Sequence, residues 1–587
     1  MKLIIRYLKP YKLRLLIGFT IKLIGTLADL VIPYLLSYII DEILPTKDLR
    51  LVIIYGLAMI ASSIICFLFN VWANQMASYI CKLFTTNLRH DLFEKINTLS
   101  SSQYDEITMP SLISRMTTDT YNVHHMVGMM QRIGVRAPIL LIGGVIITVF
   151  QDLTLTLILV AILPFIILLS YLITKKAIPL FTKVQNTLDL MVTEIRENVT
   201  GIRVIKALSK NEYEKEKFGK INKQVMDLEI RSGNAMAKLS PIMSALLNMG
   251  LVFVVVVGAF RVSNAAVGVG KIISFTTYFT IILNACLTIT RIFVTFSRSA
   301  ASAMRIDYVF SVPTLDDTVD KIKVSDIEDN DNPLIEFKDV SFKYNDTSEE
   351  NVLSNISFKI NKNESFGIIG PTGCGKSTII SLLMKFYDVM EGNIYIKGVD
   401  INEINTSSLR NMFGTCFQND TIFTDTVLNN IKFGRDVSYD DVIKASRNSL
   451  AEKFILNHED GYDYLLSPKG TNISGGQKQR IFISRALAGS FDCLILDDAT
   501  SALDYKTDSI IRHQIKENYP DTTNIIISQR ISSIMNCDYI MMLDSGIVTG
   551  YGSHEYLLKT NAEYQQIYNA QMGVNKHNVN MEVQDEF

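Results

Sequence analysis

The sequence has few charged residues, few cysteines and no excess of charge of one sign. Only 20% of its 587 residues are charged, and 57 basic against 59 acidic residues give a formal net charge of −2. Proteins that bind a nucleic-acid backbone usually carry a basic excess, so nothing here indicates such a partner. The seven cysteines are scattered and form no CxxC pair, which is typical of reduced thiols and argues against a disulfide framework or a zinc site.

Length and hydrophobicity together predict more than one kind of domain. At 587 residues the chain is too long for one compact domain. Its 48% hydrophobic residues and mean hydropathy of +0.21 are apolar for a soluble protein but polar for a pure membrane channel. A chain that is half membrane and half soluble averages to such values. The same composition excludes disorder except at the ends of the chain.

Long apolar runs are confined to the first 300 residues. Four of them carry no charged side chain, and each has about the 20 residues that cross a bilayer as a helix. Two further runs are apolar but contain charges. We therefore predict six transmembrane spans, near residues 13–40, 51–72, 133–150, 153–174, 239–260 and 272–295. An even number of spans places both ends of the chain on the same side of the membrane.

The distribution of basic residues predicts the orientation of these spans. Lysines and arginines concentrate in two long stretches, between spans two and three and between spans four and five, while the opposite loops DEILPTKDLR and QDL are short. The positive-inside rule places both termini and both long stretches in the cytoplasm, with Arg261 and Lys271 as a weak exception. Helical spacing of apolar residues predicts that the spans continue beyond the bilayer and are joined by short cross-helices near 104–113 and 209–217.

Charged side chains inside a span are functional candidates, because charge is costly in hydrocarbon. Three pairs are spaced so that both members lie on one helix face: Lys22 with Asp29, Arg132 with Arg136, and Arg291 with Arg298. The alternative for the arginines is that they lie in water or at headgroups, on helices that extend into the cytoplasm. The last span mixes aromatic and polar residues, either to line a cavity for amphipathic solutes or by chance: Tyr278, Phe279, Asn284 and Thr288.

The composition changes after residue 305. We expect a helical polytopic membrane domain over residues 1–305 and an acidic linker over 306–333. An α/β domain with mixed strand and helix patterns is expected over 334–573, and a frayed polar tail over 574–587.

A phosphate-binding motif lies near the start of the α/β domain. GPTGCGKST fits G-x-x-x-x-G-K-[ST] between a strand-like and a helix-like run. Its glycines let backbone N–H groups wrap a phosphate chain, and the helix N-terminus adds its dipole. Lys376 suits the β- and γ-phosphates and the Ser377 hydroxyl suits Mg²⁺, so ATP and Mg²⁺ are the predicted ligands. The loop residues are Gly370, Pro371, Thr372, Gly373, Cys374, Gly375, Lys376, Ser377 and Thr378.

Two further motifs follow the phosphate-binding loop. CLILDD at 493–498 is an apolar strand that ends in acid, and Asp497 is placed as a carboxylate for magnesium. ISGGQ at 473–477 opens a helix with two glycines, which suits a second anionic contact. In this combination and order the chain resembles the ATP-binding cassette (ABC) transporters, specifically exporter-type half-transporters with six spans ahead of one nucleotide-binding domain of the P-loop NTPase class. The resemblance covers nearly the whole chain.

The resemblance implies roles for further residues. Tyr344 would stack on adenine, Gln418 would contact Mg²⁺ beside Ser377 and Asp497, and Asp504 would lie at a dimer interface. The two cross-helices would be coupling helices that dock on the nucleotide domains. A signature motif would close on ATP held by a second chain, so that two domains enclose two ATP molecules: Ser474, Gly475, Gly476 and Gln477.

Two positions depart from the family pattern. The family glutamate that polarises the attacking water is Asp498 here, one methylene shorter, and a misplacement of about 1 Å can lower a rate about 100-fold. The family switch histidine, which contacts the γ-phosphate, is Gln529, whose amide cannot carry a charge. We interpret this chain's own site as one that binds ATP and hydrolyses it slowly.

These departures lead to a hypothesis about assembly. A homodimer would repeat the altered residues in both sites, so the intact signature is expected to complete a competent site on a different half-transporter that retains Glu and His. Heterodimeric bacterial exporters have such a degenerate member. The partners would be that second chain, membrane lipids and amphipathic cargo, drugs first and lipids or peptides second, exported across the bacterial plasma membrane. An ATP-gated membrane sensor and a homodimeric lipid or peptide exporter are the alternatives.

Overall fold

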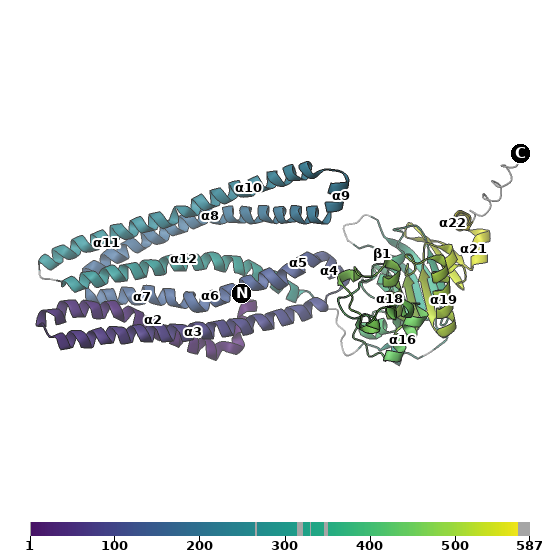
Figure 1. The fold of residues 1–587 in the computed structure, drawn as a ribbon, viewed down its shortest axis with the longest axis horizontal. Helices are drawn as coiled ribbons and strands as arrows, with labels where there is room; N and C mark the ends of the chain where they lie inside the picture. The colour runs from purple at the N-terminus through teal and green to yellow at the C-terminus, as the bar shows by residue number, and fades with distance from the viewer. Residues whose placement is uncertain (1, 265–266, 314–320, 329, 345–349, 573–587) are drawn as a thin grey trace. The chain divides into compact units, whose positions relative to one another are not determined.

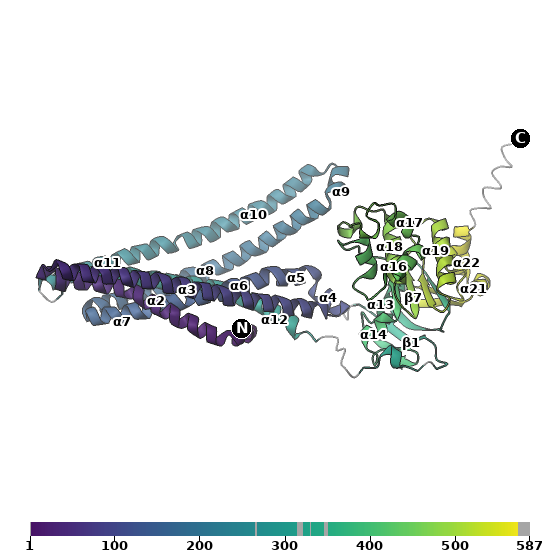
Figure 2. The same ribbon diagram turned by 60° about the horizontal axis from the view of Figure 1, so that its bottom comes forward.

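The structure, a computed structural model, describes residues 2–572 apart from 265–266, 314–320, 329 and 345–349 (Figures 1 and 2). The chain forms two compact units. One consists of Met1–Thr98 and Ile107–Pro313, and the other of Leu99–Glu106 and the residues that follow Pro313. The first is helical and the second contains β-sheets with helices, which confirms the predicted fold class.

Two β-sheets form the frame of the second unit. One is antiparallel with the order β2-β1-β4-β5, and the other has the order β10-β9-β3-β8-β7-β6. In the larger sheet β9, β3, β8, β7 and β6 run parallel, and β10 is antiparallel at one edge. The strands are β1 (Ile335–Phe342), β2 (Leu353–Ile360), β3 (Ser365–Ile369), β4 (Glu391–Ile396), β5 (Val399–Asp400), β6 (Phe413–Cys416), β7 (Cys493–Asp497), β8 (Thr523–Ile527), β9 (Tyr539–Asp544) and β10 (Ile547–Gly552).

Helices surround these sheets. All five residues of β7 are buried, as expected for a parallel strand covered on both faces, and this explains its continuous apolar sequence. The helices are α13 (Lys376–Leu383), α14 (Thr406–Asn411), α15 (Val427–Lys432), α16 (Tyr439–Asn448), α17 (Glu452–Ile455), α18 (Gly475–Leu487), α19 (Tyr505–Asn518), α20 (Ile531–Ile534), α21 (His554–Thr560) and α22 (Ala562–Met572). Helix α4 (Ser101–Ile107) adds a segment from early in the chain, and its Asp105 accepts a 2.7 Å hydrogen bond from the Tyr387 hydroxyl.

Long helices make up the first unit. In Figure 1, α8 and α10 run side by side and the short α9 joins them at one end. The helices are α1 (Lys2–Leu8), α2 (Lys12–Tyr38), α3 (Leu49–Asn97), α5 (Met109–Ser114), α6 (Thr120–Met129), α7 (Val135–Gln151), α8 (Leu153–Thr200), α9 (Ile202–Ala207), α10 (Asn211–Ala237), α11 (Leu239–Ser263) and α12 (Val269–Ser311).

Within the described residues, six helical segments are long and apolar enough to cross a membrane, which confirms the number of spans predicted. They are Lys2–Thr46, Leu49–Asn97, Met109–Gln151, Leu153–Ile173, Asn211–Ser263 and Val269–Ile289. Two of these segments, the first and the third, include π-helical turns, in which the backbone holds one more residue per turn than an α-helix. These turns are η2 (Ile39–Ile43), η4 (Arg115–Asp119) and η5 (Met130–Gly134), of which the last two lie within the third span.

The short helices between spans differ in part from the sequence prediction. Helices α4 and α5 overlap the predicted range 104–113. The second short helix, α9, lies earlier than the predicted 209–217, because Gly201 ends α8 and the turn to α10 is made at Ser209, whose φ is 52°. Residues 211–217 instead form the first turns of α10. Whether these short helices act as coupling helices stays a prediction.

Most charged groups predicted within the spans have polar partners in this unit. Lys22 is buried and donates a 3.0 Å hydrogen bond to Asn74, and Arg136 lies 2.7 Å from Asp29. Arg132 donates to the Gly128 carbonyl. The side chains of Arg291 and Arg298 lie outside the described part of the chain.

Two further residues that the sequence analysis singled out, Arg261 and Tyr278, also have partners in this unit. Arg261, which argued weakly against the predicted orientation, forms a 2.9 Å ion pair with Asp152. Its charge is therefore neutralised locally. In the last span Tyr278 is fully buried and donates a 2.6 Å hydrogen bond to the Leu30 carbonyl, so this tyrosine packs inside the unit.

An ion pair ties the third span to the last helix of this unit. Asp119, which is 1% exposed, accepts a 2.8 Å hydrogen bond from Arg305 Nε and a second from Arg305 Nη2. Asn122 adds a 3.1 Å hydrogen bond to Ser302 and accepts another from Ser299 at its carbonyl. A buried carboxylate needs such a partner, because an uncompensated buried charge is costly.

We predict that Arg305→Gln lowers the free energy of unfolding by about 1–3 kcal/mol, since it leaves the buried Asp119 carboxylate without its cation. Adding Asp119→Asn removes that charge and should restore most of the loss. The measurement is the thermal unfolding of the detergent-solubilised protein in a double-mutant cycle. Lys220→Gln, in the exposed Lys220–Glu216 pair, is the control and should change little. Strictly additive losses from the two single variants would contradict the coupling.

Candidate nucleotide-binding site

The predicted phosphate-binding loop connects strand β3 to helix α13. Gly375 has a φ of 103°, a left-handed conformation that side-chain-bearing residues rarely adopt. At Gly370 a Cβ atom would lie 1.9 Å from the Leu543 carbonyl oxygen, so no other residue fits there without moving the backbone of β9. These two glycines let the loop turn back over the N-terminus of α13, with its N–H groups available to an anion.

Lys376 is the first residue of α13 and is held against the loop. Its Nζ donates hydrogen bonds to the carbonyl oxygens of Gly370 at 2.9 Å and Pro371 at 2.6 Å. Both acceptors are neutral, so the ammonium charge has no carboxylate partner among these contacts. A phosphate oxygen is a stronger, charge-assisted acceptor. Cys374 in the same loop is buried, and burial raises the pKa of its thiol, so it is expected to be unreactive.

A cavity of about 420 Å³ opens beside this loop. It brings together predicted residues from five separate parts of the chain. Four of these parts follow the parallel strands β3, β6, β7 and β8, which end at the same edge of the sheet, and Tyr344 follows β1. The predicted residues in its wall are Tyr344, Thr372, Gly373, Gly375, Lys376, Ser377, Thr378, Gln418, Asp497, Asp498 and Gln529. Gly370, Pro371 and Cys374 belong to the loop but do not line the cavity.

Three lining residues were missed by the sequence reasoning: Val352, Ile527 and Ser528. Ile527 and Ser528 directly precede Gln529 at the end of β8, so their position next to a predicted residue was the available signal. Val352 precedes β2 in an ordinary apolar context, and nothing in the sequence marks it.

Asp497 ends strand β7 and is 4% exposed. Burial raises the pKa of its carboxyl, and the Ser377 hydroxyl, which hydrogen-bonds to it, partly opposes that shift. A buried carboxylate beside a hydroxyl offers the oxygen ligands that Mg²⁺ prefers. The donor set of Ser377, Asp497 and the Gln418 amide therefore fits a magnesium ion, as the sequence predicts.

Asp498 and Gln529 face the same cavity. Asp498 has a φ of 49°, a left-handed conformation that Asp and Asn adopt more readily than other non-glycine residues. Its Oδ2 lies 3.5 Å from Gln418 Nε2. Gln529 follows Ser528 at the end of β8, and its side chain is exposed. The two residues that depart from the family pattern thus stand at the open side of the site.

Tyr344 is another residue of the cavity wall. Its hydroxyl is 3.0 Å from Thr378 Oγ1, and its ring makes edge contacts with Phe342 and Tyr387. The residue is 48% exposed. An aromatic ring supported at its edges and open to the cavity can stack on a planar base.

The signature residues lie outside the cavity. Ser474 caps helix α18 by accepting a hydrogen bond from the Gln477 amide, and Gln477 Oε1 accepts one from the Ser474 amide at 2.8 Å. Beside this capping box Ser474 and Gly475 are exposed, and the following residues of α18 are half-buried. Asp504 likewise caps helix α19, where it accepts hydrogen bonds from the amide and hydroxyl of Thr507.

Comparisons with known proteins decide the family. Residues 15–286 match the ABC transporter transmembrane region, and residues 353–501 match the ABC transporter domain. The chain is 32% identical over 568 residues to YfiB of Bacillus subtilis (strain 168), an uncharacterized ABC transporter ATP-binding protein, with 97% of this chain and 98% of that protein covered. The chain belongs to the ABC transporter family.

Further relatives and a solved structure place it among the exporters. It is similar to an ATP-dependent lipid A-core flippase of Syntrophus aciditrophicus (strain SB), at 28% identity over 98% of this chain and 95% of the relative. A putative multidrug export ATP-binding/permease protein, YgaD of Bacillus subtilis (strain 168), is 27% identical over 97% and 99%. A bacterial Atm1-family ABC exporter solved with ATP bound shares the fold, with a TM-score of 0.82, 23% identity and coverage of 95% of this chain and 99% of that chain. This chain is therefore an ABC exporter half-transporter, a multi-pass plasma-membrane protein with an ATP-binding ATPase domain.

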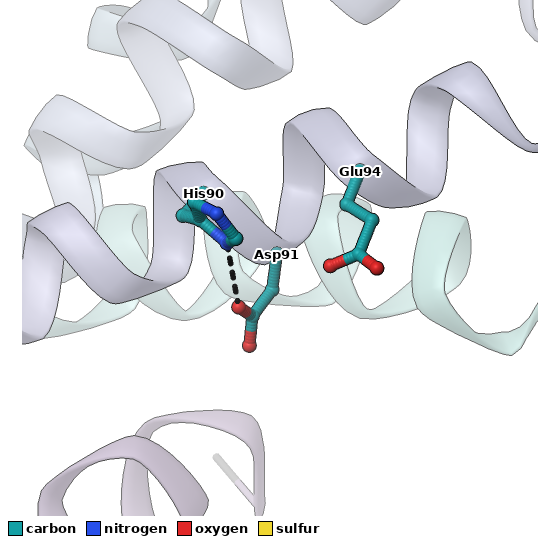
Figure 3. Close-up of side chains that lie close together, drawn as sticks. All are labelled: His90, Asp91 and Glu94. Atoms are coloured by element: carbon teal, nitrogen blue, oxygen red, sulfur yellow. Dashed lines mark hydrogen bonds and ion pairs between the residues drawn. The ribbon is translucent and has the colours of Figure 1, made fainter.

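A second group of potential metal ligands lies elsewhere in this ABC exporter. His90 and Asp91 are neighbours in α3, Glu94 lies one turn further on, and their ligand atoms lie within 4.8 Å of one another (Figure 3). His90 and Glu94 are exposed, and Asp91 already accepts a 2.6 Å hydrogen bond from the Tyr7 hydroxyl. Exposed acidic groups of this kind are common without a bound ion, so we assign no metal to them.

We predict that Asp497→Asn raises the thermal midpoint of the nucleotide-free ABC exporter by about 1–3 °C, because it removes a buried charge, and abolishes the stabilisation by Mg²⁺ and ATP. The pKa of Asp497 is raised in the folded state, so the ionised carboxylate lowers the stability of the fold. This loss of stability is complete well above that pKa and disappears as the pH falls below it and the carboxyl is protonated. The difference between variant and wild type should therefore shrink toward acid pH. Unfolding measured by intrinsic fluorescence across pH tests this, and a difference independent of pH would contradict it.

Proposed function

We propose that this chain is one half of a heterodimeric exporter that moves amphipathic compounds across the bacterial membrane, and that its own ATP site is hydrolytically impaired. The observation that carries the proposal is the presence of Asp498 and Gln529 in the wall of the nucleotide cavity, where the family has glutamate and histidine. The rest of the cavity keeps the residues for binding ATP. Binding and hydrolysis are thereby separated within one site.

Asp498 supports slow hydrolysis through its reach. Aspartate is one methylene shorter than glutamate, so its carboxylate stops about one C–C bond short of the position from which a glutamate would polarise water. The contact between Asp498 and Gln418 Nε2 is long, at 3.5 Å, and does not draw the carboxylate forward. General-base catalysis needs hydrogen-bond distance to the attacking water.

Gln529 supports the same conclusion through charge. A histidine can take up a proton and so stabilise the negative charge that develops on the γ-phosphate, whereas a glutamine amide can only donate a neutral hydrogen bond. Such a donor still recognises a terminal phosphate. The site is therefore suited to retain ATP rather than to turn it over.

The signature motif supports a second, competent site on another chain. The start of α18 is capped, its Ser474 and Gly475 are exposed, and it does not line this chain's cavity. The N-terminus of a helix attracts phosphate through its N–H groups and dipole. We infer that it completes the ATP site of a partner that carries the catalytic Glu and His, and that Asp504 lies near the interface of the two chains.

The cargo class is inferred from the relatives and from the spans. Two relatives are described by their names as an ATP-dependent lipid A-core flippase and a putative multidrug export ATP-binding/permease protein. The Asp29–Arg136 pair, partly exposed inside spans, would provide polar character on a surface within the membrane. We place both termini and the long helical extensions in the cytoplasm.

In the proposed cycle, ATP enters with its base against Tyr344 and its phosphates in the loop at Lys376. Lys376 exchanges its two carbonyl acceptors for phosphate oxygens, and Ser377, Gln418 and Asp497 would hold Mg²⁺, which neutralises phosphate charge when bound. Closure of the two nucleotide domains would reach the spans through the short helices α4, α5 and α9, and so switch them from inward to outward opening. Hydrolysis at the partner's site resets the cycle.

The first test is ATP turnover by three preparations: this chain alone, its Asp498→Glu/Gln529→His variant, and the chain co-purified with its native partner. We expect negligible turnover by the chain alone and robust turnover in the partnered preparation, with a gain of about tenfold or more in the double variant if the lost geometry and charge are restored. Strong turnover by the unmodified chain alone would contradict the proposal and indicate a homodimeric pump. Binding of ATP without turnover in any preparation would favour an ATP-gated sensor.

The second test compares two substitutions in this chain within the partnered preparation. Gly476→Asp places a negative charge where the partner's phosphate would bind, and it should abolish turnover. A Cβ at Gly476 meets no atom closer than 3.5 Å, so folding should not suffer. Lys376→Ala weakens ATP binding only in this chain's own site and should leave a substantial part of turnover. The reverse ranking would place the competent site on this chain.

A further inference from the structure

The C-terminal helix α22 holds the segment that carries Gln529. Gln571, in the last turn of α22, donates a hydrogen bond from Nε2 to the Gln529 carbonyl and accepts one at Oε1 from the Ile531 amide, each 2.8 Å long. Both polar groups of this glutamine are therefore used on the backbone, on the two sides of Arg530. A side chain at an exposed helix end would ordinarily be solvated and free to rotate.

Gln571 supplies a hydrogen-bond acceptor at the start of α20. Ile531 is the first residue of α20, and the N–H groups of a first helical turn have no acceptor within the helix. The amide of Gln571 supplies that acceptor while it fixes the carbonyl of Gln529. Since the backbone is held at both points, the direction in which the Gln529 side chain leaves the chain is set from α22.

Helix α22 is itself well anchored. Tyr564 is fully buried in a cluster with Ile531 and Ile534, and its hydroxyl lies 2.7 Å from His554 Nδ1. Gln571 lies seven residues after Tyr564, so both side chains lie on the same face of the helix. The face of α22 that packs on α20 therefore ends at Gln571, whose side-chain amide binds the segment that carries Gln529.

Arg530 lies between the Gln529 carbonyl and the Ile531 amide, and its side chain contacts a different loop. Its guanidinium donates to the carbonyl oxygens of Leu503 at 3.2 Å and Ser501 at 3.1 Å. Gln479 of α18 accepts from the Ala502 amide and donates to Ser501 Oγ. The side-chain amide of Gln571 therefore fixes the position of two residues. One is Gln529, which faces the nucleotide site, and the other is Arg530, which supports the loop beside the signature helix α18.

We propose that Gln571 is a positioning residue for the nucleotide site. Its two hydrogen bonds to the backbone around Arg530 place Gln529 for contact with the terminal phosphate. Helix α22 thereby determines how well this site distinguishes ATP from ADP. The inference rests on the proposed function, in which this chain's own cavity binds ATP. Gln571 does not line the cavity, so it acts through Gln529.

The test measures the dissociation constants of ATP and ADP, each with Mg²⁺, for the full-length purified chain by equilibrium dialysis. Gln571→Ala should weaken ATP binding about 3- to 10-fold, as expected for one or two neutral hydrogen bonds, and change ADP binding less than about twofold. Gln529→Ala should show the same selective loss. The double variant should be no worse than either single variant, because both changes remove one contact.

Two further variants separate positioning from loss of structure. Gln571→Glu keeps the acceptor for the Ile531 amide but presents a carboxylate to the Gln529 carbonyl, so it should weaken ATP binding at least as much as Gln571→Ala. Gln565→Ala, on the same helix at an exposed position, is the matched control and should change neither constant. Equal losses for ATP and ADP, additive effects of the Gln571 and Gln529 changes, or the same loss in Gln565→Ala would overturn the proposal.

A failure of the proposed function would give a different experimental result. Robust turnover by the unmodified chain alone would contradict the impaired site but not the role of Gln571. The ratio of affinities for a non-hydrolysable ATP analogue and ADP would still decide that role in the same set of variants. An unchanged ratio in Gln571→Ala would then reject the positioning role by itself.

Discussion

The nucleotide site depends on the register of the parallel strands in the larger sheet. Ile368 of β3 lies opposite Ile527 of β8, and Ile527 lies opposite Asp497 of β7. This row of hydrogen-bonded partners places the loop after β3, the residues after β8 and the carboxylate of β7 at one level. A shift of one residue in either pairing would turn Asp497 or its neighbours to the other face of the sheet. The pairing of the strand backbones thus determines which side chains are brought to the site.

Much of this site could be predicted from the sequence, because its residues belong to short motifs whose context is local. The loop around Lys376 and the acid at the end of β7 each combine a strand-like run with a specific residue. The six spans were predicted for a similar reason, since length and hydrophobicity are properties of a continuous segment. Gly201, which ends α8, was a signal for the position of α9 that the predicted range 209–217 did not take into account.

What could not be predicted are contacts between residues distant in the chain that carry no motif. Gln571 meets Gln529 across 42 residues, and Arg305 meets Asp119 across 186. Glutamine and arginine are ordinary residues for exposed helices, so only the packing of those helices reveals their partners. The same holds for Lys22, whose cost inside an apolar span is offset by Asn74 of the next helix. Such pairs are set by tertiary structure and leave no periodic pattern.

The π-helical turns in the third span have a consequence for how its length can change. Each such turn contains one residue more than an α-helical turn, so a helix that lost one residue within η4 or η5 could close the gap by returning to α-helical geometry. The residues on either side would then keep the faces they present to their neighbours. A single deletion elsewhere in the span would rotate every later side chain by about 100° about the helix axis. These two turns are therefore places where the span tolerates a change of length. Asp119, the last residue of η4, would keep its partner after a deletion earlier in η4 or within η5.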